Sequence, residues 1–169
     1  DVTYAGYNGD GHIGRLNLTA SVYYAFGKES LATFTASEND IDAWFLATEA
    51  SVDFDWYRIR VSALYATGDD DPFDDKSRGF DAIFENPIFA GADTSFWIRQ
   101  AVPNIGGGGV TLSNRNGILN SLRSKDHGQS NFTNPGIRLL GLGADMDLTP
   151  QLRLSLNVNK LDFADTTSV

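Results

Sequence analysis

Five segments of the chain alternate apolar and polar residues, and this period of two constrains the fold more than any other feature. Between residues 56 and 66, for example, Tyr57 and Ile59 alternate with Arg58 and Arg60. Successive side chains of a β-strand point to opposite faces, so each segment predicts a strand with one apolar and one polar face. The predicted strands cover residues 12–27, 41–54, 56–66, 137–148 and 152–163.

The pattern also predicts how two pairs of these strands meet. A tight turn at residues 54–55 would place Val52 opposite Tyr57 and Glu49 opposite Arg60, so that apolar residues face apolar ones. A slip by one residue would send every side chain to the other face, which fixes the face that each residue occupies.

The second hairpin turns at residues 149–151, where Pro150 is acceptable because a turn needs no ladder N–H. This turn would place Asp147 opposite Arg153. The apolar pairs predicted by the same register are Leu148 with Leu152, Met146 with Leu154, and Ala144 with Leu156. At the start of the chain, we expect residues 1–7 to end an earlier strand and the stretch NGDGHIG, residues 8–14, to form a turn.

Alternation alone fits both a soluble antiparallel sandwich and a transmembrane barrel. Three features favour the barrel. The polar faces lack lysine, aromatic residues cluster near the strand ends, and short turns alternate with a long connection at residues 67–136. Outer-membrane barrels have aromatic girdles, short periplasmic turns and long external loops. The clustered aromatic residues are Tyr24, Phe26, Trp44, Phe54, Trp56, Tyr57 and Tyr65.

We therefore predict an all-β, antiparallel, up-and-down barrel in the bacterial outer membrane, in contact with its lipid. About five to six strands cannot close a barrel, and unpaired edges are not viable in lipid. We therefore expect residues 1–169 to be a single, partial barrel domain of a longer protein.

Composition narrows the function. The chain has 22 acidic and 13 basic residues and a net charge of −9, which argues against a nucleic-acid partner. It has no cysteine, its two histidines lie far apart in sequence, and it has no nucleophile-elbow motif, so we expect no enzyme activity. No apolar run of ~18 residues is present for a transmembrane helix. Residues 69–93 alone carry a net charge of −6, so the acidity belongs mainly to the long connection.

That connection opens with GDDDPFDD, and clustered carboxylates on a turn are candidate Ca²⁺ ligands. The alternative is a solvated acidic loop, since the spacing does not match the EF-hand pattern. An aromatic stretch from Phe80 to Trp97 is expected to pack against itself or to fold into the pore mouth, and residues 114–124 predict a short helix. The candidate calcium ligands are Asp69, Asp70, Asp71, Asp74 and Asp75.

The polar positions of the strands are the candidate pore lining. They mix arginines with carboxylates, and a group of arginines near residues 15 and 58–60 predicts a basic constriction. The candidates are Arg15, Asn17, Glu49, Arg58, Arg60, Arg138, Asp145 and Arg153.

Several motifs together carry a family resemblance. The most specific are GDDDP, GFDAIFENPIFAG and SFW between residues 68 and 97, followed by LSNRNGILNSLRS and FTNPGIRLLGLGADMDLTPQLRLSLNVNKLDF. With GDGHIGRLNLTASVYYAFG near the start, the chain resembles the alginate-export family of bacterial outer-membrane proteins. The resemblance implies a monomeric barrel of many more strands that passively transports a polysaccharide or another polar solute. An alginate exporter would have a strongly basic lumen, whereas the inward positions here are mixed.

We therefore predict a channel for passive diffusion or export of a polar solute or polysaccharide. One alternative is a non-transporting barrel that is a structural or docking component of an envelope assembly, with other envelope proteins as its partners. The other alternative is a soluble carbohydrate-binding sandwich.

Overall fold

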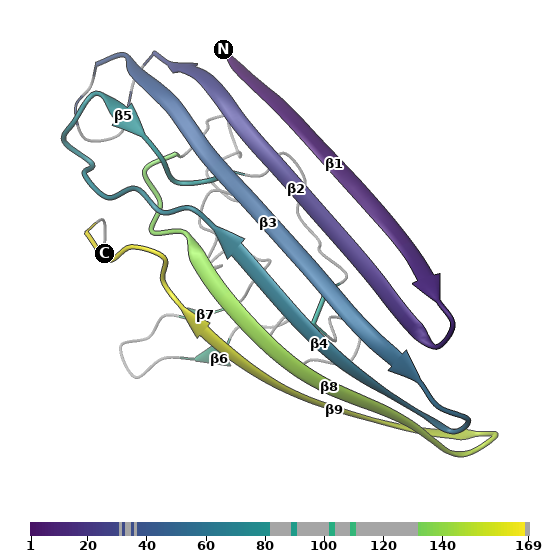
Figure 1. The fold of residues 1–169 in the computed structure, drawn as a ribbon. Helices are drawn as coiled ribbons and strands as arrows, with labels where there is room; N and C mark the ends of the chain where they lie inside the picture. The colour runs from purple at the N-terminus through teal and green to yellow at the C-terminus, as the bar shows by residue number, and fades with distance from the viewer. Residues whose placement is uncertain are drawn as a thin grey trace.

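The computed structural model describes residues 1–30, 32, 35, 37–81, 89–90 and 132–167, together with the backbone of residues 102–103 and 109–110 (Figure 1). Its main sheet has the strand order β1-β2-β3-β4-β8-β9, with each neighbour antiparallel to the next. These strands are β1 (Val2–Ile13), β2 (Leu16–Glu29), β3 (Asn39–Asp53), β4 (Tyr57–Ala66), β8 (Ile137–Thr149) and β9 (Leu152–Asp162).

Three short strands complete the described structure. β5 (Lys76–Ser77) pairs in parallel with the start of β3, and β6 (Val102–Pro103) pairs with β7 (Gly109–Val110) in a separate two-stranded sheet. The described residues form no helix, and so none that is long and apolar enough to cross a membrane. The predicted all-β antiparallel fold is thus confirmed, but as an open sheet whose edges are β1 and β9 and not as a closed barrel.

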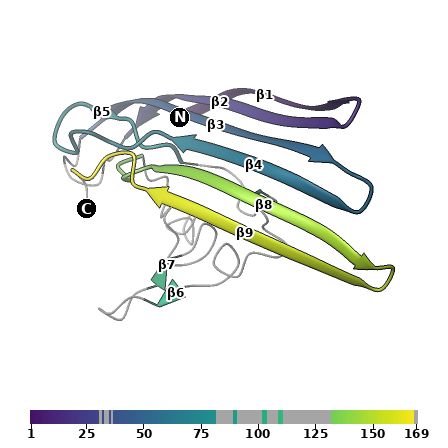
Figure 2. The same ribbon diagram turned by 60° about the horizontal axis from the view of Figure 1, so that its bottom comes forward.

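The connections divide the sheet into two ends (Figures 1 and 2). The three short connections β1–β2, β3–β4 and β8–β9 lie at one end, which we call the turn end. The connections β2–β3 and β4–β8, together with both termini, lie at the other, which we call the loop end. The predicted alternation of short and long connections is therefore present.

The first strand differs from the prediction. Residues 8–13 belong to β1, and the turn is at Gly14, whose φ of 59° suits glycine. Glycines hid the strand because they interrupt its alternation. A Cβ added to Gly6 would strike the ring of Tyr23, and one added to Gly9 would lie 2.6 Å from the Tyr7 hydroxyl oxygen. Aromatic rings thus cover Gly6 and Gly9 of this edge strand and supply the packing that these glycines lack.

The β3–β4 register is two residues away from the predicted one. Val52 lies opposite Ile59, and Glu49 lies opposite Ser62 instead of Arg60. The turn is wider than the predicted one at residues 54–55. It is closed by a hydrogen bond from the Phe54 N–H to the Tyr57 carbonyl at 2.8 Å. A shift of two residues keeps every side chain on its face, so alternation could not detect it.

The β8–β9 register is confirmed over most of its length. Asp147 lies opposite Arg153 and Met146 opposite Leu154. Only the last pair differs, because an irregularity between Asp147 and Thr149 places Thr149 opposite Leu152.

A core covers the loop end of one sheet face. The strands contribute small side chains there, including Ala25, Ala43 and Ala66, and the long connection contributes Phe80 and Phe132. Small residues on the sheet leave room for these rings. Phe132 is fully buried, and burial of a large apolar side chain stabilises by about 1.5–3 kcal/mol.

Phe80 holds its segment to the sheet by ring contacts. Its ring stacks on Phe45 at 5.2 Å and meets Tyr4 edge-on at 6.2 Å. Phe89 also packs against this core. These residues thus pack against the sheet, and a pore mouth stays a prediction. Residues 82–88 and 91–97 of the aromatic stretch lie outside the described residues, as does the predicted helix at 114–124.

Candidate functional site

The sheet has two unlike faces along most of its length. The face that carries the core at the loop end bears charged and polar side chains toward the turn end, and we call it the polar face. The other, the apolar face, carries Leu18, Trp44, Val61, Leu142 and Leu156, which are all exposed. A soluble sheet usually packs its apolar face into the core and exposes its polar face, whereas here the apolar face is exposed.

The apolar face has long uncharged runs in three of its strands. Its residues run without a charge from Trp44 to Val52 in β3, from Tyr57 to Tyr65 in β4 and from Leu140 to Leu148 in β8. Each run spans about nine residues, the length that a tilted barrel strand needs to cross a bilayer. Thr48 is the polar side chain in the β3 run, and its hydroxyl donates to the Thr19 carbonyl at 3.0 Å. The charged residues of this face all lie at the loop end: Lys28, Asp40, Asp42, Arg138, Lys160 and Asp162.

Aromatic side chains border the apolar runs at both ends. At the loop end the rings of Tyr24 and Trp44 stack at 4.4 Å, with Phe26 beside them. At the turn end Phe54 stacks on Tyr57 at 4.4 Å, and Trp56 is 54% exposed. Tyr and Trp are enriched where a membrane meets water, so both rows occupy the place that interfacial belts would.

Arg60 is the centre of the polar face. Its Nη1 donates to Asp145 Oδ2 at 2.7 Å and its Nη2 donates to Asn157 Oδ1 at 2.6 Å, while its Nε lies 3.7 Å from Glu49 Oε2. The side chain is only 10% exposed. Glu49 also accepts hydrogen bonds from the Ser62 hydroxyl at 2.6 Å and from the Ala90 N–H of the long connection at 3.1 Å. The network therefore joins four strands, β3, β4, β8 and β9, to the connection.

A glycine makes room for this network. A Cβ on Gly143 would lie 2.6 Å from Arg60 Nη2 and 2.9 Å from Asn157 Oδ1. The guanidinium thus crosses β8 over a position where no other residue fits without a shift. Alternation did not predict a role for Gly143 or Asn157, although glycine among the polar positions of a strand indicates a close approach.

Two further arginines are paired nearer the turn end. Arg58 binds Asp53 through two nitrogens, and Asn17 Nδ2 donates to the same carboxylate at 2.8 Å. Arg153 Nε lies 2.7 Å from Asp147 Oδ1. Both pairs are about half exposed, so each contributes little to stability, about 0–1 kcal/mol.

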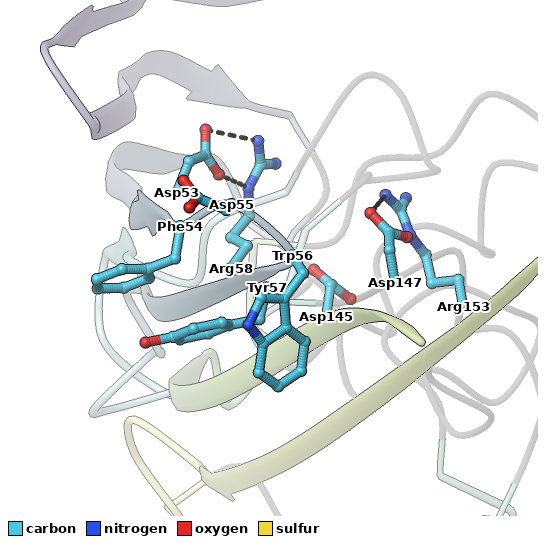
Figure 3. Close-up of a pocket in the computed structure, with 9 residues that line it drawn as sticks. All are labelled: Asp53, Phe54, Asp55, Trp56, Tyr57, Arg58, Asp145, Asp147 and Arg153. Carbon is cyan, nitrogen blue, oxygen red and sulfur yellow. Dashed lines mark hydrogen bonds and ion pairs between the residues drawn. The ribbon is translucent and has the colours of Figure 1, made fainter. Parts of the chain in front are cut away.

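These two pairs frame a cavity of about 270 Å³ at the turn end (Figure 3). In Figure 3 the Asp53–Arg58 pair and the Asp147–Arg153 pair stand on either side of Asp145, and the rings of Phe54, Trp56 and Tyr57 lie together to one side. The cavity is lined by Asp53, Phe54, Asp55, Trp56, Tyr57, Arg58, Asp145, Asp147 and Arg153.

Six of the eight predicted pore-lining residues share the polar face, and two do not. Arg15 lies in the β1–β2 turn, 3.7 Å from Asp55 and over the Phe54 ring. Arg138 lies two residues before Leu140 in β8, so the two side chains share the apolar face. Arg138 Nη2 donates to the Ala164 carbonyl. The six that meet on the polar face are Asn17, Glu49, Arg58, Arg60, Asp145 and Arg153. The predicted basic constriction is therefore replaced by arginines paired with carboxylates.

The two ends of the long connection are fastened together at the loop end. We call residues 67–81 and 132–136 the loop base. The buried Asn134 side chain donates to the Phe80 carbonyl at 3.0 Å and accepts from the Gly136 N–H at 2.8 Å, and the Gly79 N–H donates to the Phe132 carbonyl at 2.7 Å. A Cβ on Gly68 would strike the Pro135 carbonyl, so these backbones approach as closely as glycine allows.

The five candidate calcium ligands lie in this loop base. Arg78 Nη1 binds Asp70 Oδ1 at 2.6 Å and Asp74 Oδ2 at 3.0 Å, so a cation of the protein itself occupies two of the carboxylates. Asp69 is fully buried, and burial raises its pKa to about 6. No group of three or more metal-ligating side chains occurs among the described residues, and the calcium site remains a prediction from the sequence.

Comparisons of the chain with models of known protein families, with curated proteins and with solved structures find no match.

Proposed function

We propose that the chain forms part of an outer-membrane β-barrel channel through which a polar solute diffuses. The observation that carries the proposal is the exposed apolar face. Val61 and Leu142, paired at the centre of the sheet, are 53% and 57% exposed, and Val158 is 74% exposed. Soluble monomers rarely leave so continuous an apolar surface in water, whereas lipid is its natural solvent.

The polar face would then line the lumen. Its charged groups are held by partners in register on neighbouring strands, as with Arg60 and Asp145 across β4 and β8. A polar interior behind an apolar exterior is the alternation of transmembrane barrel strands. The turn end would face the periplasm and the loop end the outside, by the usual asymmetry of their connections.

The edges of the sheet indicate how a barrel would be completed. β1 runs from the loop end to the turn end and β9 runs back, so the two edges have the directions that antiparallel closure requires. Among the described residues neither outer edge has a partner strand. In lipid those backbone groups must be paired, and we propose that further strands provide the pairing.

Planar-bilayer recording of the purified, reconstituted full-length protein tests the channel. We expect stepwise conductance that is absent from bilayers treated with detergent alone. Folded protein that remains in the aqueous fraction without detergent would contradict the membrane assignment and favour the soluble sandwich.

The long connection is proposed to restrict entry. Its base is closed by the Gly79–Phe132 hydrogen bond, so residues 82–131 can be replaced by a short Gly-Ser linker without stretching the loop base. We expect the shortened protein to conduct more than the parent. Unchanged conductance and selectivity would reject the restricting role.

A non-transporting barrel is the second candidate, and the core at the loop end favours it. Phe80 and Phe132 pack tightly on the polar face there, and the Ala90 N–H reaches Glu49 farther along the strand. A reconstituted protein that folds in lipid and never conducts would favour this structural or docking role. The alginate-export resemblance stays a proposal about ancestry, and polysaccharide a proposed solute.

A further inference from the structure

We propose that the polar face disfavours anions, so that its solutes are neutral or cationic polar molecules and its small-ion current is carried mainly by cations. This inference rests on the proposed channel function and names its solute class. It differs from what a basic lumen would do, because arginines alone would concentrate anions.

The first observation is that carboxylates already occupy the arginines of the polar face. Arg58 holds Asp53 in a two-nitrogen contact, and Arg153 holds Asp147 through Nε at 2.7 Å and Nη2 at 3.1 Å. Such bidentate contacts use the donors that would otherwise grip a carboxylate or phosphate on a solute. An entering anion would have to displace a tethered carboxylate from each guanidinium.

Arg60 is even less available. Its Nη1 and Nη2 are committed to Asp145 and Asn157, its side chain is 10% exposed, and Glu49 lies beside its Nε. The Gly143 backbone lies under the guanidinium and fixes its position across β8. Arg60 cannot bind a solute without breaking two charge-assisted hydrogen bonds.

The second observation is that carboxylates exceed arginines on the described turn-end half of this face. Asp10 lies there too, since it faces Thr19, which in turn faces Glu49 on the next strand. The balance is a net charge of −2, from Asp10, Glu49, Asp53, Asp145 and Asp147 against Arg58, Arg60 and Arg153.

The cavity at the turn end also holds Asp55, whose charge is offset by Arg15 at 3.7 Å, and it presents both exposed ion pairs to its interior (Figure 3). A narrow passage lined by one excess sign of charge raises the local concentration of counter-ions. Cations would therefore gather at the turn-end mouth, and neutral hydroxyl-bearing solutes would find paired donors and acceptors there.

The test is the reversal potential of the reconstituted full-length protein under a KCl gradient. We expect a potential that shows preference for K⁺ over Cl⁻. The variant Asp53→Asn/Asp147→Asn keeps side-chain shape and frees Arg58 and Arg153. It should move the reversal potential toward the equilibrium potential of Cl⁻. The matched control Asp40→Asn/Asp162→Asn changes net charge equally on the other face, at the loop end, and should leave the potential where it was.

A second variant keeps the proposal testable if the first fails to fold. Arg58→Gln/Arg153→Gln should increase the preference for K⁺. A parent protein that prefers Cl⁻, or an equal shift in the control Asp40→Asn/Asp162→Asn, would overturn the inference without contradicting the proposed channel function. Absence of conductance from folded protein in lipid would remove the channel, and the inference with it.

Discussion

Gly143→Ala is the substitution that most sharply tests the packing of the polar face. The new methyl would lie 2.6 Å from Arg60 Nη2, 3.0 Å from Arg60 Cζ and 2.9 Å from Asn157 Oδ1. These distances are too short for real contacts. We therefore expect the guanidinium to move away from β8 and to lose its hydrogen bond to Asn157.

The size of the effect follows from two opposing contributions. A hydrogen bond to a charged group is worth about 1.5–3 kcal/mol. Replacing glycine by alanine returns about 0.4–1 kcal/mol by restricting the unfolded chain. We therefore expect a net loss of about 1–2 kcal/mol in the free energy of unfolding.

Equilibrium urea unfolding in lipid vesicles, followed by tryptophan fluorescence, measures this loss. Gly11→Ala is the matched control, because a Cβ at Gly11 in β1 meets nothing within 4 Å. We expect that control to be neutral or slightly stabilising. In an Arg60→Ala background the Gly143→Ala penalty should become much smaller, since the guanidinium that the methyl displaces is gone and only Asn157 Oδ1 remains close. A penalty of the same size in both backgrounds would refute the account of Gly143.

Three further predictions concern the apolar face and the loop base. Val61→Arg should destabilise the folded protein in vesicles by about 2–4 kcal/mol, as expected for a charge at the bilayer midplane. Thr19→Arg on the polar face should destabilise it much less. The pKa of Asp69 is raised by burial to about 6, so the folded loop base binds this proton more tightly than the unfolded chain. Lowering the pH from 7 through 6 should therefore slow protease cleavage of the loop base, and Asp69→Asn should abolish that dependence. Asn134→Ala leaves two backbone groups unpaired at about 1–3 kcal/mol each and should speed the same cleavage.

The sequence predicted the strands well where both faces had distinct chemistry. In β4 and β8 the alternation of Ile59 and Leu142 with charged or glycine positions identified the strands and their faces. β1 was missed because Gly6, Gly9 and Gly11 carry no side chain to reveal a face. The rings of Tyr7 and Tyr23 cover two of those glycines. The alternation of apolar and polar residues cannot reveal such a contact.

The candidate site was predicted by residue type better than by pairing. Alternation placed Glu49, Arg58 and Arg60 on one face, and Arg60 does lie 3.7 Å from Glu49, although the register is two residues away from the predicted one. The hydrogen-bond partners of Arg60, Asp145 and Asn157, come from β8 and β9, beyond the long connection. Pairing between strands so distant in sequence depends on how the sheet is assembled, which local patterns do not contain.

The proposed channel requires that the apolar face lies in lipid. The chain has no cysteine, so single substitutions give unique sites for a spin label. We would label Val61→Cys and Leu142→Cys on the apolar face and Ser155→Cys on the polar face, and compare relaxation by oxygen with relaxation by a water-soluble nickel chelate in vesicles. We expect oxygen to reach the labels at residues 61 and 142 and the chelate not to reach them, with the opposite result at residue 155. Free access of the chelate to residues 61 and 142 would contradict it.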